Sequence, residues 1–289
     1  MLRSLVGSEM CIRDSLFVMY GIINNIYQGK GDAAHIHVYD IVKCFDKMWL
    51  KEVMNDLYDV QMKNDHLSLL YKMNEKSKVA VKTSFGMTER MEIDEIVLQG
   101  GVWGPLECSI QIDSLGKENL TDIKELYRYK SSVSIPPLAM IDDIAAVTKC
   151  GIDSVILNAK INSKIESKRL QLGPEKCQDM HIGKQKDNWQ TCPTLKVHDN
   201  EMLKSNKIKY LGDMITMDGI NDENIKERES KGIGAINQVI TMLNQISLGY
   251  HHFNIGLLLR DTNIINSILF NSEVWYGLSA GHIESLEKI

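Results

Sequence analysis

The sequence predicts an α+β fold, in which helices pack on one face of a sheet and a helical region follows. Three observations lead to this class. Segments typical of strands alternate irregularly with amphipathic helical segments. The chain from Asn221 onward has helical periodicity only. The 289 residues are 44% hydrophobic and 25% charged, which is ordinary for a globular protein with a sizeable core.

The elements of the first half follow from periodicity and from turn residues. Gly29 to Gly31 ends the first helix, and an alternating strand ends near Asp40. The next helix has Leu50, Val53, Met54, Leu57 and Val60 on one face, and Asp46 is a candidate cap. The expected elements are a helix over Leu16–Gln28, a strand to Asp40, helices from Lys47 and over His66–Met73, and paired strands over Val79–Thr83 and Met91–Val97.

The second half begins with a helix from about Glu107. Pro136 and Pro137 precede a hairpin, and Gly173-Pro174 ends a long helix. The expected elements are a hairpin over Leu138–Val147, a helix over Gly151–Leu172, sheet strands over Met180–Ile182 and Ile208–Leu211, a polar loop over Lys184–Asn200, and helices over 223–245, 254–272 and 280–288.

Composition excludes several classes of protein. The net charge of −5 argues against a uniformly basic nucleic-acid binder, although a local basic groove remains compatible with it. The six cysteines include no C-x-x-C pair, so no zinc site is expected, and they fit reduced thiols inside a cell, in the nucleus or cytoplasm. No apolar stretch is long enough for a membrane span. Residues 1–15 lack a signal-peptide core and are similar to translated adapter sequence, so we expect a non-native leader.

The most informative feature is the pair Asp142-Asp143 inside the apolar run from Leu138 to Val147. Two adjacent carboxylates cost free energy in an apolar segment, because each loses hydration and repels the other. The run therefore predicts two short strands with the aspartates at the turn. Such a tip presents oxygen ligands, which hard divalent cations prefer.

A third carboxylate, Asp40, ends the alternating strand about a hundred residues upstream. If that strand lies beside the hairpin, three carboxylates converge and can hold two Mg²⁺ ions roughly 3.5–4 Å apart, as polymerases and nucleases do. Taken alone, an Asp-Asp pair is more often a turn or a helix cap. The flanking apolar strands and the Asp40 segment together favour the metal site.

Five segments in order resemble the motifs of reverse transcriptases of the non-LTR retrotransposon kind. The segments are Asp40–Asp46, Leu98–Leu106, Met140–Asp143, Lys168–Lys184 and Ile208–Gly212. One departure is Met140, where the family usually has an aromatic residue. The resemblance implies a polymerase palm over 34–215 and a helical thumb over 216–289, with residues 16–33 as the remnant of a fingers region.

The resemblance also implies roles for individual residues. Asp40 and Asp142, with Asp143 and the carbonyl of Ile41, would bind two Mg²⁺ ions, with Mn²⁺ as an alternative, for transfer of a nucleotide to a primer 3′-hydroxyl. Lys176 would give a proton or a countercharge to pyrophosphate. The residues expected to contact the nucleotide, template or primer are Phe45 as a steric gate against ribose, Gln99, Gly100, Tyr210 and Gly212.

Three functions remain open at this stage. The first is an RNA-directed DNA polymerase that uses a primed RNA or DNA template and deoxynucleoside triphosphates, with no membrane partner and an undetermined oligomeric state. The second is a catalytically inactive nucleic-acid-binding remnant, because most of the fingers and any endonuclease domain are missing. The third is a two-metal nuclease or phosphohydrolase. The glycine-rich second motif and the helical C-terminal region argue against it, since hydrolysis needs no template groove.

Overall fold

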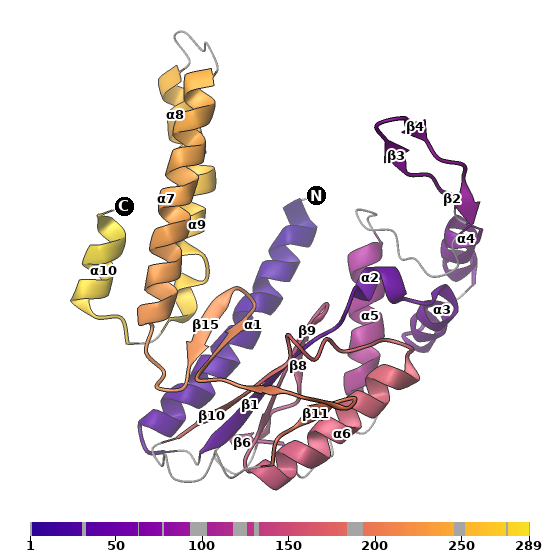
Figure 1. The fold of residues 1–289 in the computed structure, drawn as a ribbon, viewed down its shortest axis with the longest axis horizontal. Helices are drawn as coiled ribbons and strands as arrows, with labels where there is room; N and C mark the ends of the chain where they lie inside the picture. Colours follow the sequence, from indigo (N-terminus) through magenta and orange to yellow (C-terminus); the bar gives the residue numbers. More distant parts are fainter. Residues whose placement is uncertain are drawn as a thin grey trace. The chain divides into compact units, whose positions relative to one another are not determined.

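A computed structural model describes residues 2–30, 33–62, 64–76, 78–92, 103–117, 126–129, 133–183, 193–245, 252–275 and 277–288. The chain divides into two compact units (Figure 1). Residues 32–205 form the sheet unit, and residues 1–31 with 206–289 form the helical unit. Within the described residues no helix is both long and apolar enough to cross a membrane.

The sheet unit is built on a mixed five-stranded sheet with the order β13-β10-β1-β9-β8. Its strands are β1 (Ala34–Asp40), β8 (Leu138–Met140), β9 (Asp143–Thr148), β10 (Gln178–Ile182) and β13 (Leu203–Lys204). All neighbours are antiparallel except β10 and β13. The β1 strand is the middle strand of this sheet, and its residues are therefore buried along almost its whole length.

Helices cover one face of this sheet, as the sequence predicted. They are α2 (Cys44–Lys47), α3 (Leu50–Asp59), α4 (Asp65–Asn74), α5 (Gly104–Lys117) and α6 (Gly151–Ser167). Helix α5 contacts α3, α6 and β8, and α6 contacts β9. The core between them contains Tyr39, Ile41, Leu57, Ile144 and Leu157, each nearly inaccessible to solvent. The cost of ordering these elements is offset chiefly by this apolar burial.

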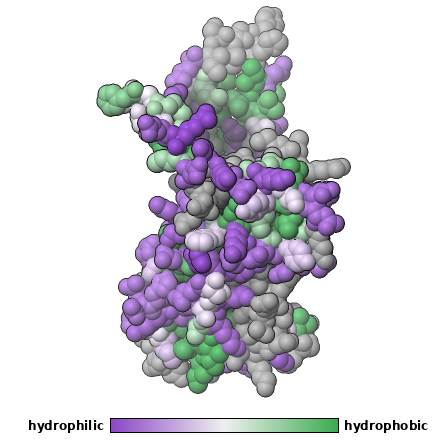
Figure 2. Space-filling view, turned by 90° about the vertical axis from the view of Figure 1, so that its right-hand side faces the viewer, coloured by the Kyte–Doolittle hydropathy of each residue, from purple (hydrophilic) through white to green (hydrophobic). Residues whose placement is uncertain are grey.

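An arm of two short ladders follows α4. Strand β2 (Lys78–Val79) pairs with β5 (Met91–Glu92), and β3 (Lys82–Thr83) pairs with β4 (Gly86–Met87). The arm is exposed, and Figure 2 shows the side that carries it, with apolar residues scattered among hydrophilic ones. A shorter hairpin, β6 (Arg128–Tyr129) with β7 (Val133–Ser134), precedes the aspartate pair, and β11 (Lys196–Val197) with β12 (Asn200–Glu201) precedes β13.

The helical unit contains one hairpin, β14 (Lys207–Tyr210) with β15 (Asp213–Thr216). Its helices are α1 (Leu2–Tyr27), α7 (Asp222–Gln245), α8 (His252–Leu259), a π-helical segment (Arg260–Ile264), α9 (Ile265–Leu269), a 3₁₀ turn (Ser272–Val274) and α10 (Ala280–Glu287). Ser279 caps α10 through its side-chain oxygen, which accepts from the His282 amide.

The structure corrects several expected boundaries. Helix α1 begins at Leu2 rather than Leu16, and α6 ends at Ser167 rather than Leu172. Asp46 lies inside the short helix α2, and the helix after it begins at Leu50 with no side-chain cap. The strand expected over Ile208–Leu211 does not join the main sheet, because it pairs only with β15. Residues 93–97 and 184–192 of the expected strand and loop lie outside the described residues.

Candidate functional site

The aspartates from the two acidic segments meet on neighbouring strands. Asp40 is the last residue of β1, and its partner in the antiparallel register is Asp143, the first residue of β9. Directly opposed residues place their side chains on the same face, with Cβ atoms about 4.5–5.5 Å apart. The Ile41 amide donates to the Asp142 carbonyl at 3.3 Å, which ties the end of β1 to the hairpin turn. The predicted pairing of the two segments is therefore present.

The hairpin turn itself has an unusual backbone. Only Ile141 and Asp142 separate the paired residues Met140 and Asp143. Ile141 has φ of 57°, a left-handed conformation that a β-branched residue adopts rarely and at a cost. This turn gives Asp142 its place at the tip beside Asp40 and Asp143. Nothing in the sequence indicates it, since isoleucine is among the least suitable residues for such a conformation.

Burial and neighbouring negative charge both act on the Asp143 carboxyl. Burial, followed by the charges of Asp142 and Asp40, raises the pKa of Asp143 to about 6, while the nearby Lys176 ammonium acts in the opposite direction. Ionised carboxylates in this arrangement are therefore poorly compensated by the protein alone. A site of this kind favours an added cation.

Lys176 is the cation that the protein supplies. Its Nζ donates to both carboxylate oxygens of Asp40, at 3.1 and 3.2 Å, and this partner raises the pKa of the lysine. The Gly173 amide donates to the Asp40 carbonyl at 2.9 Å, so the turn that carries Lys176 is anchored to the end of β1. The lysine side chain is 63% exposed, which leaves it free to turn away from Asp40.

The oxygen donors suit a hard divalent cation, but the side chains are not arranged as a complete metal site. Among the described residues, no group of three or more His, Cys, Asp or Glu side chains is positioned to hold a metal ion. Asp40 is engaged by Lys176 instead. The backbone of Ile41 lies at the same strand end, with its side chain buried and a bridge to Leu172. Metal binding would therefore require Lys176 to leave Asp40 and the carboxylates to converge.

The residues predicted to contact the nucleotide, template or primer lie partly in each of the two units and partly outside the described residues. Phe45 lies on α2, half-buried against the main core of the sheet unit. Gln99 and Gly100 lie outside the described residues, and the described part of their motif begins at Trp103, just before α5. Tyr210 and Gly212 belong to the helical unit. The Tyr210 side chain is 1% exposed, while Gly212 is in the turn of the β14–β15 hairpin.

Two basic residues that could have contacted phosphate have partners within the protein. Lys168 forms an ion pair with the buried Asp56 at 2.5 Å, and the Arg169 guanidinium lies 3.7 Å from the centre of the Trp49 ring. Both contacts join the end of α6 to the α3 region. These side chains therefore stabilise the sheet unit.

Two buried polar clusters were not predicted. In the sheet unit, Asp179 on β10 lies 3.0 Å from Nδ1 of His37, whose Nε2 lies 3.1 Å from the Thr148 hydroxyl. In the helical unit, Asp213 accepts hydrogen bonds from four side chains. Alternation along β1 could have indicated that His35 and His37 share a face. Only the fold shows that their partner is Asp179.

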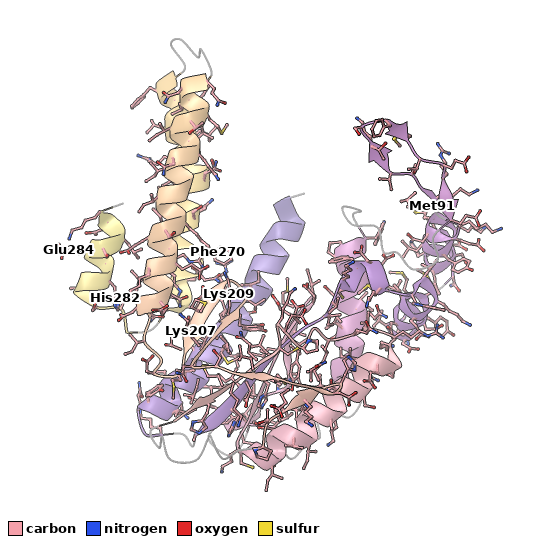
Figure 3. All side chains as sticks on the ribbon, in the orientation of Figure 1. Met91, Lys207, Lys209, Phe270, His282 and Glu284 are labelled. Atoms are coloured by element: carbon pink, nitrogen blue, oxygen red, sulfur yellow. The ribbon has the colours of Figure 1, made fainter. Side chains whose placement is uncertain are left out.

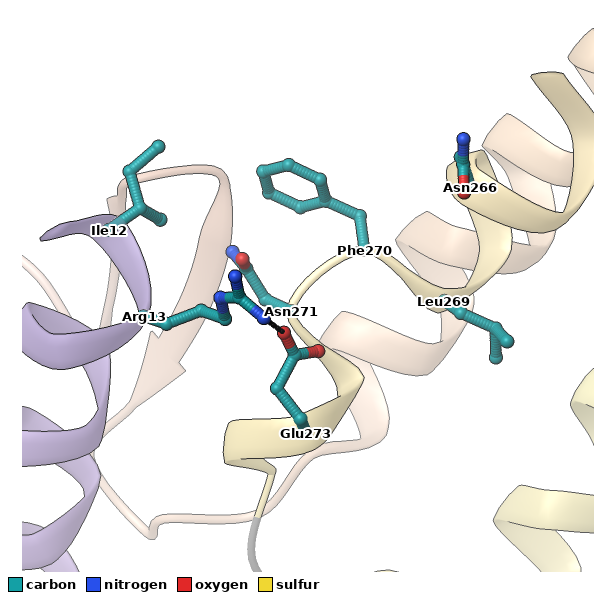
Figure 4. Close-up of a pocket in the computed structure, with 7 residues that line it drawn as sticks. All are labelled: Ile12, Arg13, Asn266, Leu269, Phe270, Asn271 and Glu273. Carbon is teal, nitrogen blue, oxygen red and sulfur yellow. Dashed lines mark hydrogen bonds and ion pairs between the residues drawn. The ribbon is translucent and has the colours of Figure 1, made fainter. Parts of the chain in front are cut away.

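Two pockets are lined by described residues, and neither includes the acidic cluster. One, of about 440 Å³, lies in the helical unit beside Phe270 and is bounded by the Arg13–Glu273 ion pair at 3.1 Å (Figure 4). Its other lining residues are Ile12, Asn266, Leu269 and Asn271. The second, of about 280 Å³, lies between α3 and α4.

Comparison with known structures identifies the fold. Apo telomerase from Candida tropicalis is 12% identical, with a TM-score of 0.50, over 99% of this chain and 46% of that chain. Telomerase from Candida albicans with a TWJ fragment of telomeric RNA is 13% identical, with a TM-score of 0.45, over 99% of this chain and 50% of that chain. The chain thus spans about half the length of these structures. The former likeness supports an α+β fold with a palm-like sheet and a helical C-terminal region.

Comparison with protein families is more specific. No curated protein matches the chain. The family model described as reverse transcriptase (RNA-dependent DNA polymerase) matches residues 9–215, which include all five motif segments found in the sequence. This match covers well over half of the 289 residues. The chain therefore belongs to the reverse transcriptase family.

Proposed function

We propose that this chain is an RNA-directed DNA polymerase of the non-LTR retrotransposon kind, or a fragment of one. It would extend a primer 3′-hydroxyl on an RNA or DNA template with deoxynucleoside triphosphates, inside the cell. The observation that carries the proposal is the pairing of Asp40 with Asp143, with Asp142 in the adjoining turn. The order of the five motifs supports the non-LTR assignment.

The acidic cluster would be the catalytic centre. Asp40, Asp142 and Asp143, with the carbonyl of Ile41, would hold two Mg²⁺ or Mn²⁺ ions after Lys176 has moved. Such ions lower the pKa of the attacking hydroxyl and stabilise the leaving pyrophosphate. The protein itself contributes the rigid strand ends that keep the carboxylates together. Lys176, released from Asp40, would donate a proton or a countercharge to pyrophosphate.

The remaining residues would bind the substrates. Phe45, five residues after Asp40, would exclude a ribose 2′-hydroxyl, and Gln99 and Gly100 would contact the nucleotide or template. Primer contact would come from the turn that contains Gly212, because the Tyr210 ring is buried. In the proposed division of the chain, residues 16–33 would belong to a fingers region, residues 34–215 would form the palm and residues 216–289 the thumb.

Primer extension tests the proposal directly. The full chain with Mg²⁺ and deoxynucleoside triphosphates should extend a primer on RNA and DNA templates, and Asp142→Asn should abolish extension. The matched control is Asp199→Asn, which removes one carboxylate from the exposed turn between β11 and β12. Equal extension by the wild type and Asp142→Asn would reject the acidic cluster as the catalytic centre.

A specific observation favours a second function. In the described residues the carboxylates form no ready metal site, and Lys176 neutralises Asp40. This arrangement fits a catalytically inactive remnant that still binds a primer–template. Electron paramagnetic resonance of added Mn²⁺ separates the two functions. A polymerase should bind Mn²⁺ through the acidic cluster, with binding lost in Asp142→Asn, whereas the remnant should bind nucleic acid without it.

A further inference from the structure

Asp213 is a buried carboxylate of the helical unit that accepts four side-chain hydrogen bonds. It is the first residue of β15 and has no exposed surface. One oxygen accepts from Arg228 at 3.1 Å and from Asn271 Nδ2 at 3.2 Å. The other accepts from the Tyr20 hydroxyl at 3.2 Å and from Trp275 Nε1 at 3.0 Å. The carboxylate thus joins α1, α7 and the C-terminal segment at one point.

The first two of these partners also bind the neighbouring turn. Leu211 and Gly212, with φ of 48° and 85°, form the two-residue turn between β14 and β15. The Leu211 carbonyl accepts from Asn271 Nδ2 at 3.2 Å, and the Gly212 carbonyl accepts from Arg228 at 2.7 Å. Both carbonyls of the turn are therefore held by side chains that Asp213 orients.

The Phe270 ring lies beside both Arg228 and Gly212. The Arg228 guanidinium lies 4.8 Å from the centre of this ring, and a Cβ added to Gly212 would come within 3.1 Å of the same ring. Figure 3 shows Phe270 beside the hairpin that carries Lys207 and Lys209. The two carbonyl contacts and the aromatic neighbour thus hold the turn in its positive-φ conformation.

The orientation of the turn carbonyls determines the direction of the Gly212 N–H, which is a hydrogen-bond donor. A trans peptide directs its N–H opposite to its C=O. Because the Leu211 carbonyl points to Asn271, the Gly212 N–H points away from the buried cluster. A backbone N–H is one of the groups by which proteins bind nucleic-acid phosphates. The buried Tyr210 ring cannot make such a contact.

We propose that Asp213 is a positioning residue for the primer strand: it holds Arg228 and Asn271 on the turn carbonyls so that the Gly212 N–H meets a phosphate. This rests on the proposed function, since it assumes that the turn faces the primer. Buried charged groups can often be replaced by apolar packing without loss of stability, but apolar side chains could not orient two carbonyls.

The test compares Asp213→Asn with Val239→Ala in the full chain. The asparagine keeps the size of Asp213 but loses the charge that orients Arg228. Val239 is buried on the same helix, eleven residues beyond Arg228 and so about 16 Å along α7. Thermal unfolding establishes how much stability each variant loses, so that binding can be compared at equal stability.

Two measurements are needed. Amide hydrogen exchange over residues 207–216 reports the turn itself, and fluorescence anisotropy reports the affinity for a labelled primer–template. Asp213→Asn should accelerate exchange in the turn and weaken binding about tenfold, as expected for the loss of roughly one oriented phosphate contact. Val239→Ala should change neither at comparable stability.

The outcomes separate this proposal from the one on which it rests. Unchanged exchange in the turn of Asp213→Asn overturns the positioning role. Faster exchange with unchanged affinity overturns primer contact by this turn, while the catalytic proposal is judged independently by Asp142→Asn. Equal loss of affinity in Val239→Ala shows a general stability effect and also overturns the positioning role.

Discussion

The carboxylates that neighbour strand β1, on β10 and on β9, lie in opposite environments. On one side Asp179 on β10 lies beside His35 and His37, and these histidines hold the pKa of the carboxyl below its ordinary value, although burial acts in the other direction. On the other side Asp143 faces Asp40, and burial with neighbouring negative charge raises its pKa. Strand β1 therefore lies between a compensated acid on β10 and a poorly compensated acid on β9.

The opposite pKa shifts of Asp179 and Asp143 distinguish a carboxylate that stabilises the fold from one that could bind a ligand. Asp179 has His35 and His37 as partners within the sheet, so its charge needs no added ligand. The acidic cluster has three carboxylates and one exposed lysine. Repulsion between like charges that persists in a folded protein is typical of a functional site. Substitutions at Asp179 and in the acidic cluster should therefore have effects of opposite kind.

The largest effect is expected for catalysis by the acidic cluster. Asp40→Asn should reduce primer extension by at least about 10³-fold, because it removes a proposed ligand of ions that supply several kcal/mol of transition-state stabilisation. Its thermal stability should be close to that of the wild type. Gel-based single-nucleotide extension measures the rate, with Asp199→Asn as control. A rate within tenfold of the wild type would contradict this assignment.

The next largest effect is a loss of stability at Asp179. Asp179→Asn should lower the free energy of unfolding by about 3 kcal/mol, since it removes the carboxylate of a buried cluster whose other members are His35 and His37. Urea denaturation at pH 7 measures this. The difference from the wild type should shrink with acidification below the ordinary aspartate pKa, because stability from a lowered pKa is present above that value and lost as pH falls. A variant as stable as the wild type would remove the contrast between Asp179 and the acidic cluster.

A smaller effect of opposite sign is expected at Asp143. Because its folded pKa is raised to about 6, ionisation penalises the fold increasingly from about pH 4 to pH 6, and the penalty persists above that. Asp143→Asn should therefore raise stability at pH 8, by about 1 kcal/mol after allowance for solvent screening, and change little at pH 4. Thermal melts without divalent ions at both pH values provide the measurement. Destabilisation at pH 8 would show that the acidic cluster is as well compensated as Asp179.

The smallest effect is expected at Lys176. Its pair with Asp40 is largely exposed, so Lys176→Met should change the free energy of unfolding by less than about 0.5 kcal/mol. Mn²⁺ affinity should rise, because the competing cation on Asp40 is gone. Titration with Mn²⁺ followed by electron paramagnetic resonance measures this. Weaker Mn²⁺ binding would instead place the lysine in a supporting role.

Much of the fold was accessible from local patterns. The alternation before Asp40, the apolar halves of the Leu138–Val147 run and the periodicity of α4, α6 and α7 predicted elements that the structure contains. Boundaries were less accurate. Nothing local distinguishes the β14 strand from a strand of the main sheet, because an edge partner and a sheet partner use the same backbone hydrogen bonds.

The candidate site was predictable only in part. Burying two adjacent acids is costly, so the apolar run around Asp142 and Asp143 singles them out in the sequence alone. The ion pair between Lys176 and Asp40 joins residues 136 positions apart, so spacing could not reveal it. The roles assigned to Phe45, Gln99 and Gly100 remain predictions.

By itself, the sequence determined the family, the α+β class and which carboxylates are candidates for metal binding, because these depend on residue type, order and periodicity. Only the tertiary structure decided which side chains the acids meet. His35 and His37 meet Asp179, and Asn271 and Trp275 meet Asp213, through contacts between segments distant along the chain. The pKa of a carboxyl depends on what folding brings within a few ångströms, and local sequence does not contain that information.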